Sequence, residues 1–452
     1  MGTASPTLTR PWMTIAKTEV LQIALVIPLQ GPAGIFGPSC EACAHLAVDE
    51  INRGTGVLGR ELRLIPVDGG AAPHQVANEL DALISAGAVD AVTGWHISAV
   101  REVVAPCITD RVPYVYTALY EGGERTPGVF LTGETPECQL LPTMRWMATE
   151  LGVRRWCIIG DNYVWPWGSA KAARNYAERC GARILDEIYV ELGTAKFTNA
   201  LRRIESSGAQ GVLMFLVGND AVRFNRAFAA AGLDERMLRL TPLMEENMLL
   251  ASGAPATKGL YTASGFFESA ATPEGLDFVG RYTASYGPEA PLLNSMGESC
   301  YEGVRLLAAL IQRADGLDVP GLCSVADTVG YGGPRGEVHL QKCHLDQRIS
   351  WPEPTTSSLT LLPASGAPGR MRGDTMCLIQ RFMLCKSLLW LLVVPRAPAA
   401  RAGPRRPALV SRFCITLHDL GPWYFFVSVS SSPIASKDPW STSTPIRPPH
   451  ER

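Results

Sequence analysis

Residues 21–53 read LQIALVIPLQGPAGIFGPSCEACAHLAVDEINR. The uninterrupted apolar run Ile23–Leu29 predicts a fully buried strand, because a strand with one solvent face would alternate. Three glycines follow at three-residue spacing, and the residues after them predict a helix. A second strand is expected at Glu61–Asp68. These segments form a βαβ unit whose glycine-rich turn lies at the carboxyl end of the first strand, where open α/β sheets bind ligands.

The same alternation of strands and helices continues along the chain. The expected strands are Ile23–Leu29, Glu61–Asp68, Ala91–Gly94, Tyr114–Thr117 and Val129–Thr132, then Trp156–Gly160, Ile184–Val190, Gly211–Val217, Arg239–Leu243 and Gly259–Ser264. The expected helices are Pro142–Leu151, Ser169–Cys180, Phe197–Ser206, Asp220–Ala231 and Asn294–Ala314, with Asp220 as an N-cap. Because 452 residues exceed what one core supports, we expect an α/β fold with two lobes.

Two segments carry a resemblance to a known family: PLQGPAGIFG at 28–37 and AVDEINRGTGVLGREL at 47–62. They resemble the start of type I periplasmic binding proteins, in the Leu/Ile/Val-binding branch. Within it the chain is most similar to amide- and urea-binding members, such as the cytoplasmic amide sensor of aliphatic amidase operons. The resemblance runs from about Leu21 to Ile349.

That resemblance implies a two-lobed Venus-flytrap fold, with a parallel sheet flanked by helices in each lobe. Residues 20–133 and 265–330 are expected in the first lobe, and residues 134–264 and 331–349 in the second. Crossings are expected near Gly133–Pro136, near Gly265–Phe267 and before a strand at Gly336–Leu340. Three crossings make a hinge, which suits closure on a ligand.

The resemblance also implies a ligand pocket made by loops at the carboxyl ends of strands. The implied ligand-binding residues are Trp95, His96, Ser98, Tyr116, Thr117, Tyr163, Trp165, Val217 and Gly218. Ser98 matches a hydroxyl donor, and the backbone N–H groups of Ser98 and Ala99 add donors at a helix start. Aromatic walls with a few placed polar groups suit a small amide. His96 departs from the tyrosine of close relatives, so it either contacts the ligand or is a neutral, hydrogen-bonded residue.

Two further features of these loops have alternative interpretations. Glu245 and Glu246 could hold a ligand amino group near the cleft mouth, although acidic residues in a solvated first helical turn are commoner. Phe266 and Phe267 could close over a ligand or pack the hinge. Trp95 could fill a lobe core instead of facing the ligand.

An enzyme is the alternative class of function. The turn Gly31–Gly37 could cradle a phosphate, with Asp68 as a ribose-binding acid, but its spacing is not G-x-G-x-x-G and Pro32 has no N–H. No catalytic nucleophile stands out, so no enzyme activity and no cofactor are expected. His339, Cys343 and His344 do not match a usual zinc set, and a surface hairpin is expected there instead.

Composition limits the partners and the compartment. The net charge of −2 does not suggest nucleic acid as a partner. Apart from Cys40 and Cys43, which precede a predicted helix, the 12 cysteines are scattered along the chain, which favours a reducing compartment. Met1–Lys17 lacks an apolar export signal, so a cytoplasmic location is expected, or a periplasmic one if the start site is misplaced. The apolar run Ser387–Val394 is much shorter than the roughly 20 residues of a membrane span.

Residues 350–452 obey different compositional rules. They hold 12 Lys and Arg against 5 Asp and Glu, and 14 of the 34 prolines. The family pattern stops at Ser350-Trp351, where deletion of one base from a tyrosine codon would give Ser-Trp. Read one base earlier, this stretch can encode Leu-Ala-Gly-Ala-Asp-Asp-Leu-Glu-Phe-Asp. We therefore expect a tail that is disordered or frameshifted and adds no strand or helix, or else a genuine basic, proline-rich appendage.

The sequence thus predicts a non-catalytic solute-binding protein for a small amide, urea or amino acid. It would act with an ABC permease or a regulatory protein, without contacting nucleic acid or spanning a membrane. A nucleotide-binding α/β enzyme that uses the Gly31–Gly37 turn is the alternative.

Overall fold

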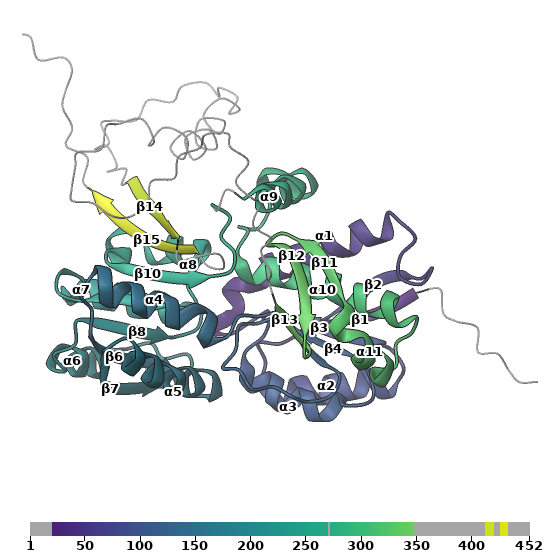
Figure 1. Cartoon of the computed structure of the whole chain (residues 1–452), viewed down its shortest axis with the longest axis horizontal. Helices are drawn as coiled ribbons and strands as arrows, with labels where there is room; N and C mark the ends of the chain where they lie inside the picture. The colour runs from purple at the N-terminus through teal and green to yellow at the C-terminus, as the bar shows by residue number, and fades with distance from the viewer. Residues whose placement is uncertain (1–19, 270–271, 347–411, 420–424, 433–452) are drawn as a thin grey trace, which may run out of the picture. The chain divides into compact units, whose positions relative to one another are not determined.

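The computed structural model describes residues 20–269, 272–346, 412–419 and 425–432. These residues form two β-sheets, each built around parallel strands and flanked by helices (Figure 1). The expected two-sheet α/β fold is therefore confirmed.

The first sheet has the strand order β11-β12-β13-β5-β4-β3-β1-β2. Its strands are β1 (Val20–Ile27), β2 (Glu61–Asp68), β3 (Ala91–Gly94), β4 (Tyr114–Tyr116), β5 (Val129–Leu131), β11 (Gly330–Gly333), β12 (Gly336–Gln341) and β13 (His344–Asp346). Strands β1 to β5 pair in parallel, whereas β11, β12 and β13 pair as antiparallel hairpins. The accompanying helices are η1 (Pro32–Phe36), α1 (Gly37–Asn52), α2 (Pro73–Ser85), α3 (Ser98–Ile108), α9 (Pro273–Tyr286), η4 (Gly287–Glu289), α10 (Ser295–Ala314), α11 (Val319–Val325) and η5 (Ala326–Thr328).

The second sheet has the order β14-β15-β10-β9-β8-β6-β7. Its strands are β6 (Arg155–Asp161), β7 (Arg183–Val190), β8 (Gly211–Phe215), β9 (Leu238–Thr241), β10 (Leu260–Ser264), β14 (Arg412–Asp419) and β15 (Phe425–Ser432). Its helices are α4 (Pro136–Glu150), α5 (Val164–Arg179), α6 (Thr198–Ser206), α7 (Asn219–Ala230), η2 (Leu233–Glu235), α8 (Glu246–Ser252) and η3 (Ala254–Thr257). We refer to the two sheets with their helices as lobe 1 and lobe 2.

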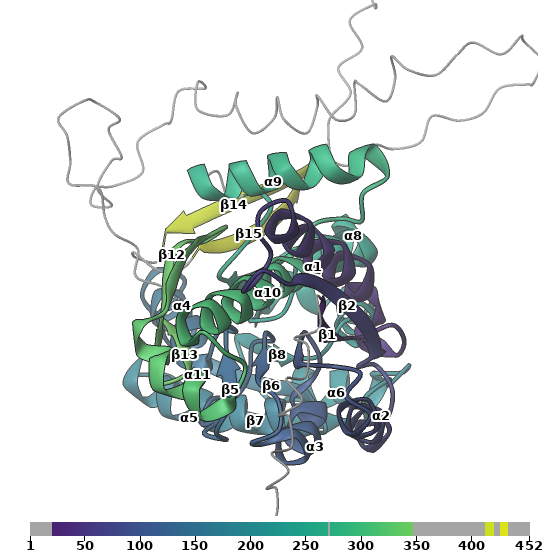
Figure 2. The same cartoon turned by 90° about the vertical axis from the view of Figure 1, so that its right-hand side faces the viewer.

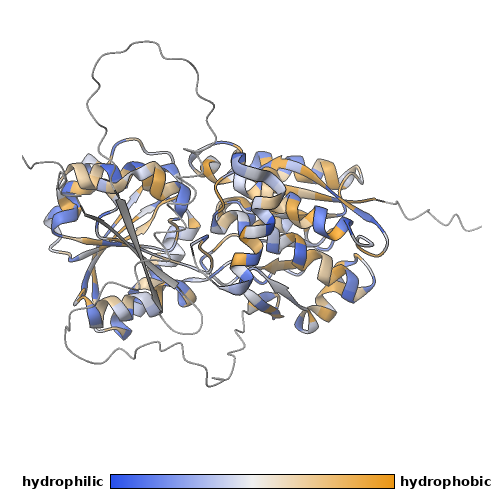
Figure 3. Cartoon of the chain, turned by 90° about the horizontal axis from the view of Figure 1, so that it is seen from above, coloured by the Kyte–Doolittle hydropathy of each residue, from blue (hydrophilic) through white to orange (hydrophobic). Residues whose placement is uncertain are grey.

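Burial explains why the apolar runs form central strands. Every residue of β3, β4, β5 and β8 is buried, as expected for parallel strands covered on both faces. The edge strand β7 is only partly buried. Figure 3 shows hydrophobic residues on the strands and a mixture of hydrophobic and hydrophilic residues along the helices. The hydrophobic core therefore lies between each sheet and its helical layers.

Helices cover both faces of the first sheet. Figures 1 and 2 show α1 and α10 on one side and α2 with α3 on the other, and each pair is in contact. In lobe 2, α4 packs on α5 and α7 packs on α8. The carboxyl ends of the parallel strands stay free of these layers, and the loops that form the candidate site begin there.

The expectation that residues 331–349 belong to the second lobe is wrong. Strands β11, β12 and β13 belong to the first sheet, with β13 next to β5. Residues 331–346 therefore lie in lobe 1, and the chain does not cross before the Gly336 strand. The sequence shows the hairpin pattern but not which sheet edge it joins, because the pairing partner β5 is about 200 residues away.

The expectation that residues 350–452 add no strand or helix is wrong. Strand β15 pairs antiparallel with β10, and β14 pairs with β15, so two tail segments extend the second sheet. Residues 347–411, 420–424 and 433–452, including Ser387–Val394, lie outside the described residues. The suspected frameshift stays a prediction.

Local boundaries differ where the chain uses an unexpected cap. Helix α4 begins at Pro136 and contains Pro142, and α5 begins at Val164 rather than Ser169. Asp220 does not cap α7; Gly218 does, with a φ of 51°. Within the described residues, no helix combines the length and apolarity that crossing a membrane requires.

Candidate functional site

A small cavity lies where loops from both sheets meet. It contains about 200 Å³ of space free of atoms, part of it open to solvent. The segments after β3 and β4 line it from lobe 1, and those after β6, β8 and β9 from lobe 2. Its lining residues are Trp95, His96, Ile97, Ser98, Ala118, Leu119, Tyr163, Trp165, Val217 and Leu243. A molecule held there would touch both lobes.

Six of the nine residues predicted from the sequence line this cavity: Trp95, His96, Ser98, Tyr163, Trp165 and Val217. The other three lie one layer behind it. The hydroxyl of Tyr116 donates to the backbone oxygen of His96 at 2.9 Å, Thr117 contacts Cys300, and Gly218 packs against Pro32. The sequence missed Ile97, Ala118, Leu119 and Leu243, whose only signal was their place in the same carboxyl-end loops.

His96 is a buried, neutral residue whose ring is held on both sides. Its Nε2 lies 2.7 Å from the hydroxyl of Tyr114, and its Nδ1 lies 3.3 Å from the carbonyl oxygen of Ile97. A carbonyl only accepts, so Nδ1 carries the proton and Nε2 accepts from Tyr114. Burial and, to a smaller extent, the charge of Arg101 lower the pKa of His96 to about 3, although the hydrogen bond to the Ile97 oxygen acts to raise it. The ring therefore presents a neutral wall to the cavity.

Replacing His96 by asparagine should change how the stability of the protein depends on pH. The folded pKa is depressed, so His96 contributes stability above the unfolded value of about 6.5, and this contribution is lost as pH falls towards 3. Between about pH 6 and pH 4, the wild-type protein should lose about 1.4 kcal/mol per pH unit relative to His96→Asn. Urea denaturation of both proteins at several pH values measures this. A pH-independent difference would show that His96 is not buried and neutral.

Ser98 lies in a buried cluster that fixes its hydroxyl. Its Oγ donates to Glu121 Oε2 at 2.7 Å, and Arg101 pairs with Glu121 at 2.6 Å and with Glu124 at 2.9 Å. The hydroxyl proton is therefore used within the protein, which corrects the expected donor role. What Ser98 Oγ offers to the cavity is a lone pair. The paired charges of Arg101 and Glu121 lie beside the cavity rather than in its lining.

The donors that remain come from a helix start and an indole. Helix α3 begins at Ser98, and the first N–H groups of a helix have no partner within it. In the described part of the chain, the indole N–H of Trp95 has no acceptor, although the side chain is only 2% exposed. The ring of Trp95 also packs edge-to-face on Phe36, with centroids 4.9 Å apart. Trp95 thus packs in the core, lines the cavity and carries a buried donor that has no acceptor among the described residues.

Lobe 2 contributes an aromatic wall. The rings of Tyr163 and Trp165 have centroids 6.3 Å apart, and Trp165 packs edge-to-face on Phe215. Burial raises the pKa of Tyr163 well above its usual value, so its hydroxyl keeps its proton and can donate.

Two buried aspartates hold the turns next to this wall. Asp161 Oδ2 accepts from the N–H of Val217 at 2.8 Å, and Asp220 Oδ2 accepts from the N–H of Gly193 at 2.5 Å. Burial, and then the charge of Asp220, raise the pKa of Asp161. These acids fix backbone turns and do not line the cavity.

Gly218 allows the lobes to approach closely. A Cβ atom added there would lie 2.1 Å from the backbone oxygen of Pro32 in η1. The φ of 51° also disfavours other residues. Nearby, the Asn247 side chain in lobe 2 donates to the Ile35 oxygen in lobe 1 at 3.0 Å.

Glu245 joins the lobes instead of facing solvent, which corrects the favoured expectation. It is 1% exposed and its Oε2 accepts from Ser295 Oγ at 3.2 Å, at the first residue of α10. Burial raises its pKa, while the N–H groups of Met296 and Ser295 favour its charged form. Burial also raises the pKa of Glu246 to about 7. Neither acid lines the cavity.

An ion cluster lies at the crossings between the lobes. Arg335 contacts Glu134 at 3.2 Å, Glu298 at 3.3 Å and Glu302, and its side chain is 2% exposed. Glu134 also accepts from the N–H of Gly265 at 2.8 Å, so the cluster holds two crossings. We call Arg335, Glu134, Glu298 and Glu302 the hinge cluster.

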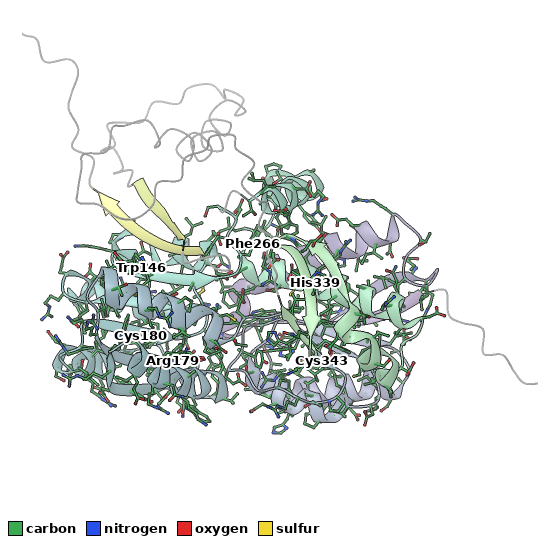
Figure 4. The ribbon with its side chains drawn as sticks, viewed as in Figure 1. Trp146, Arg179, Cys180, Phe266, His339 and Cys343 are labelled. Atoms are coloured by element: carbon green, nitrogen blue, oxygen red, sulfur yellow. The ribbon has the colours of Figure 1, made fainter. Side chains whose placement is uncertain are left out.

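Phe266 and Phe267 pack the hinge and do not line the cavity. Both are buried, and the rings of Phe266 and Phe278 of α9 meet edge-to-face with centroids 5.9 Å apart. Figure 4 labels Phe266. Their place at the second crossing therefore favours the packing interpretation over a lid.

The glycine-rich turn uses its polar groups internally. The N–H of Gly34 donates to the Gly31 oxygen, and the N–H of Gly37 donates to the Gly34 oxygen. The carboxylate of Asp68 accepts from the N–H groups of Leu29 and Gly70 at 2.9 Å each. Groups that a bound nucleotide would need are thus engaged in the turn. His339, Cys343 and His344 lie on the expected β12–β13 hairpin.

Comparisons with known proteins agree with this geometry. The family described as "Periplasmic binding protein" matches residues 20–349. A curated relative, "Leu/Ile/Val-binding protein homolog 6" of Brucella melitensis biotype 1, is 25% identical over 347 residues, covering 74% of this chain and 87% of the relative.

Solved structures share the fold. A solute-binding protein of an ABC transporter from Rhodopseudomonas palustris BisB5, in complex with 3,4-dihydroxybenzoic acid, is 20% identical with a TM-score of 0.64 and covers 73% of this chain and 91% of that one. A branched-chain amino acid transporter substrate-binding protein from Streptococcus pneumoniae, in complex with isoleucine, is 18% identical with a TM-score of 0.63, covering 72% and 93%. The expected closeness to amide-binding members stays a prediction.

Proposed function

Because the chain belongs to the periplasmic binding protein family, we propose that it is a non-catalytic solute-binding protein that holds one small molecule between its lobes. The observation that carries the proposal is the cavity lined by the strand-end loops of both sheets. A ligand there is stabilised only when both lobes contact it, so binding and lobe closure are linked.

The lining favours a small neutral ligand. None of its residues is charged, since His96 is neutral. The cavity volume open to a water molecule is only about 10 Å³, so a ligand must be small and must widen the cavity when it binds. An amino acid would bring an ammonium group, and the carboxylate of Glu121, which contacts the lining residue Ser98, already pairs with Arg101 and Ser98. An amide or urea needs acceptors and donors without charge. Ser98 Oγ, the Trp95 indole and the Tyr163 hydroxyl supply them.

An aromatic carboxylic acid is the second candidate. Trp95, Tyr163 and Trp165 offer ring faces, and the N–H groups that open α3 can bind an anion. The solved structure that holds 3,4-dihydroxybenzoic acid makes this class worth testing. Such a ligand would have to widen the cavity more than an amide or urea would, because an aromatic ring is larger.

Closure would be sensed by an ABC permease or by a regulatory partner. The family description and the named relatives support transport in the periplasm, and they do not support the expected cytoplasmic location. Residues 1–19 lie outside the described residues, so the expectation from the amino terminus stays untested.

Trp95→Phe and Tyr163→Phe test the site, because each removes one polar group and keeps an aromatic ring, although the phenyl ring is smaller than the indole of Trp95. Each should weaken binding about five- to 150-fold, since one hydrogen bond in a closed site contributes about 1–3 kcal/mol. Calorimetric titration with acetamide, urea, leucine and 4-hydroxybenzoate first identifies the ligand and then compares the variants. Thr109→Ala, at the far end of α3, is the matched control and should bind as wild type. Unchanged affinity in both phenylalanine variants would remove the cavity from the function.

A further inference from the structure

The β12–β13 hairpin has an unusual turn. Gln341 pairs with His344, so Lys342 and Cys343 form a two-residue turn, with φ angles of 51° and 63°. Such a turn normally uses Asn-Gly, because both positions need positive φ. Here neither position is asparagine or glycine. Figure 4 shows Cys343 at the end of the hairpin, with His339 farther along β12.

Contacts independent of the cysteine side chain fix this turn on its neighbours. The N–H of Lys342 donates to Asp327 Oδ1 at 2.6 Å, and the backbone oxygen of Cys343 accepts from Leu131 at 2.9 Å. The N–H of Leu340 donates to the oxygen of Val329 at 3.0 Å. The turn is thereby docked against η5, directly after α11.

Cys323 of α11 lies opposite the turn. Cys323 precedes Asp327, whose carboxylate binds the turn, by four residues, so the two side chains share one helical face. Besides burial, the Cys323 thiol raises the pKa of the Cys343 thiol, as a near neighbour would, and both residues are partly exposed. Another neighbouring pair, Cys40 with Cys300, is fully buried, where a dissolved oxidant has no access. The Cys323–Cys343 pair therefore combines neighbouring thiols, a fixed backbone and access from solvent.

We propose that Cys323 and Cys343 are a disulfide site, closed by a small disulfide oxidant of the glutathione class. One cysteine thiolate attacks oxidised glutathione, forms a mixed disulfide and releases one glutathione thiolate. The other cysteine thiolate then attacks the protein sulfur of that mixed disulfide and releases the second glutathione. The two protein thiols lose two protons and two electrons, and one oxidised glutathione becomes two reduced ones.

The compartment decides whether this bond persists. Disulfides persist in the periplasm and are rare in the cytosol. Loss of solvation raises the pKa of Cys343 to about 11, so its thiolate is scarce at neutral pH and closure should accelerate as pH rises. The bond would hold the disfavoured Lys342-Cys343 turn against α11. It would thereby also restrain strand β12, whose opposite end follows Arg335 of the hinge cluster.

Peptide mapping of the full chain tests the proposal. After oxidised glutathione and then iodoacetamide, we expect a cross-linked peptide pair that contains Cys323 and Cys343 and weighs two hydrogen atoms less than its reduced parts. Oxidation should raise the melting temperature of the wild type and of Cys107→Ser, the matched control with an exposed cysteine elsewhere on lobe 1. It should leave Cys323→Ser and Cys343→Ser unchanged.

Two results would overturn the proposal. One is recovery of both cysteines as separate alkylated or glutathionylated residues at pH 9 in a folded protein. The other is a disulfide that joins Cys343 to a different cysteine. Neither result bears on ligand binding, so the test is independent of the proposed function.

Discussion

Replacing Arg335 by methionine should lower the free energy of unfolding by about 3–5 kcal/mol. Its guanidinium group is the positive charge that three acids of the hinge cluster share, and Glu298 and Glu302 are at most 1% exposed. Removing one partner of a buried ion pair leaves the others charged without compensation. Urea denaturation at pH 8 measures the loss.

The loss should shrink in acid. Burial already raises the pKa of Glu298, even beside Arg335. Without the arginine, the folded-state pKa of Glu298 rises further above the unfolded value of about 4.3, so the variant loses stability as pH rises from that value. The deficit at pH 5 should therefore be smaller than at pH 8. Arg335→Met combined with Glu302→Gln should recover part of the stability.

An exposed arginine provides the matched control. Arg313 donates to Thr328 Oγ1 at the surface of lobe 1. Arg313→Met should therefore change the free energy of unfolding by no more than about 0.5 kcal/mol. Equal, small losses for Arg313→Met and Arg335→Met would mean that the hinge cluster is not a buried ionic network.

Ending the chain after Ile349 is the second change with a large expected effect. It removes β14 and β15 and exposes the edge of β10, along which Leu260–Ser264 pair with residues 425–429. At about 0.5–1.5 kcal/mol for each backbone hydrogen bond, we expect a loss of about 3–5 kcal/mol. A chain that ends after Ser432 keeps the hairpin and is the matched control. Identical melting of the two shortened chains would show that the hairpin contributes nothing.

A third chain tests the suspected frameshift. In it, the residues after Ile349 read in the restored frame, Tyr-Leu-Ala-Gly-Ala-Asp-Asp-Leu-Glu-Phe-Asp. If the family strand belongs on the second sheet, this chain should melt at least as high as the full-length protein. Melting no higher than the chain that ends after Ile349 would count against the frameshift.

The strands were predictable because their signal is local. A run such as Gly211–Phe215 is apolar throughout and buried throughout, so hydropathy alone places it in a sheet covered on both faces. The loops of the site were predictable for a related reason, since they follow such runs. Within a loop, however, Tyr116 and Thr117 point away from the cavity while Ala118 and Leu119 line it. Side-chain direction in a short loop depends on packing, which the sequence does not display.

Long-range contacts account for the remaining errors. In the sequence, Glu245 has the pattern of a solvated helix start. In the structure, Ser295 at the amino end of α10, 50 residues later in the chain, covers it and donates to its carboxylate. The hinge cluster draws its members from three separate segments, and the sequence showed none of these contacts. The positions of the β11–β13 layer and of the β10–β15 ladder were not predicted for the same reason, because pairing between strands far apart in the sequence leaves no local pattern.

The β10–β15 ladder has a consequence for synthesis on the ribosome. About 160 residues separate Ser264 from its partner Phe425, so at roughly 5–20 residues per second β10 waits about 8–30 s for that partner. Open strand edges recruit other chains during such delays. A partner that directly followed Ile349 would halve the wait. The yield of folded protein should therefore depend on chaperones that shield this edge during translation, apart from how stable the finished chain is.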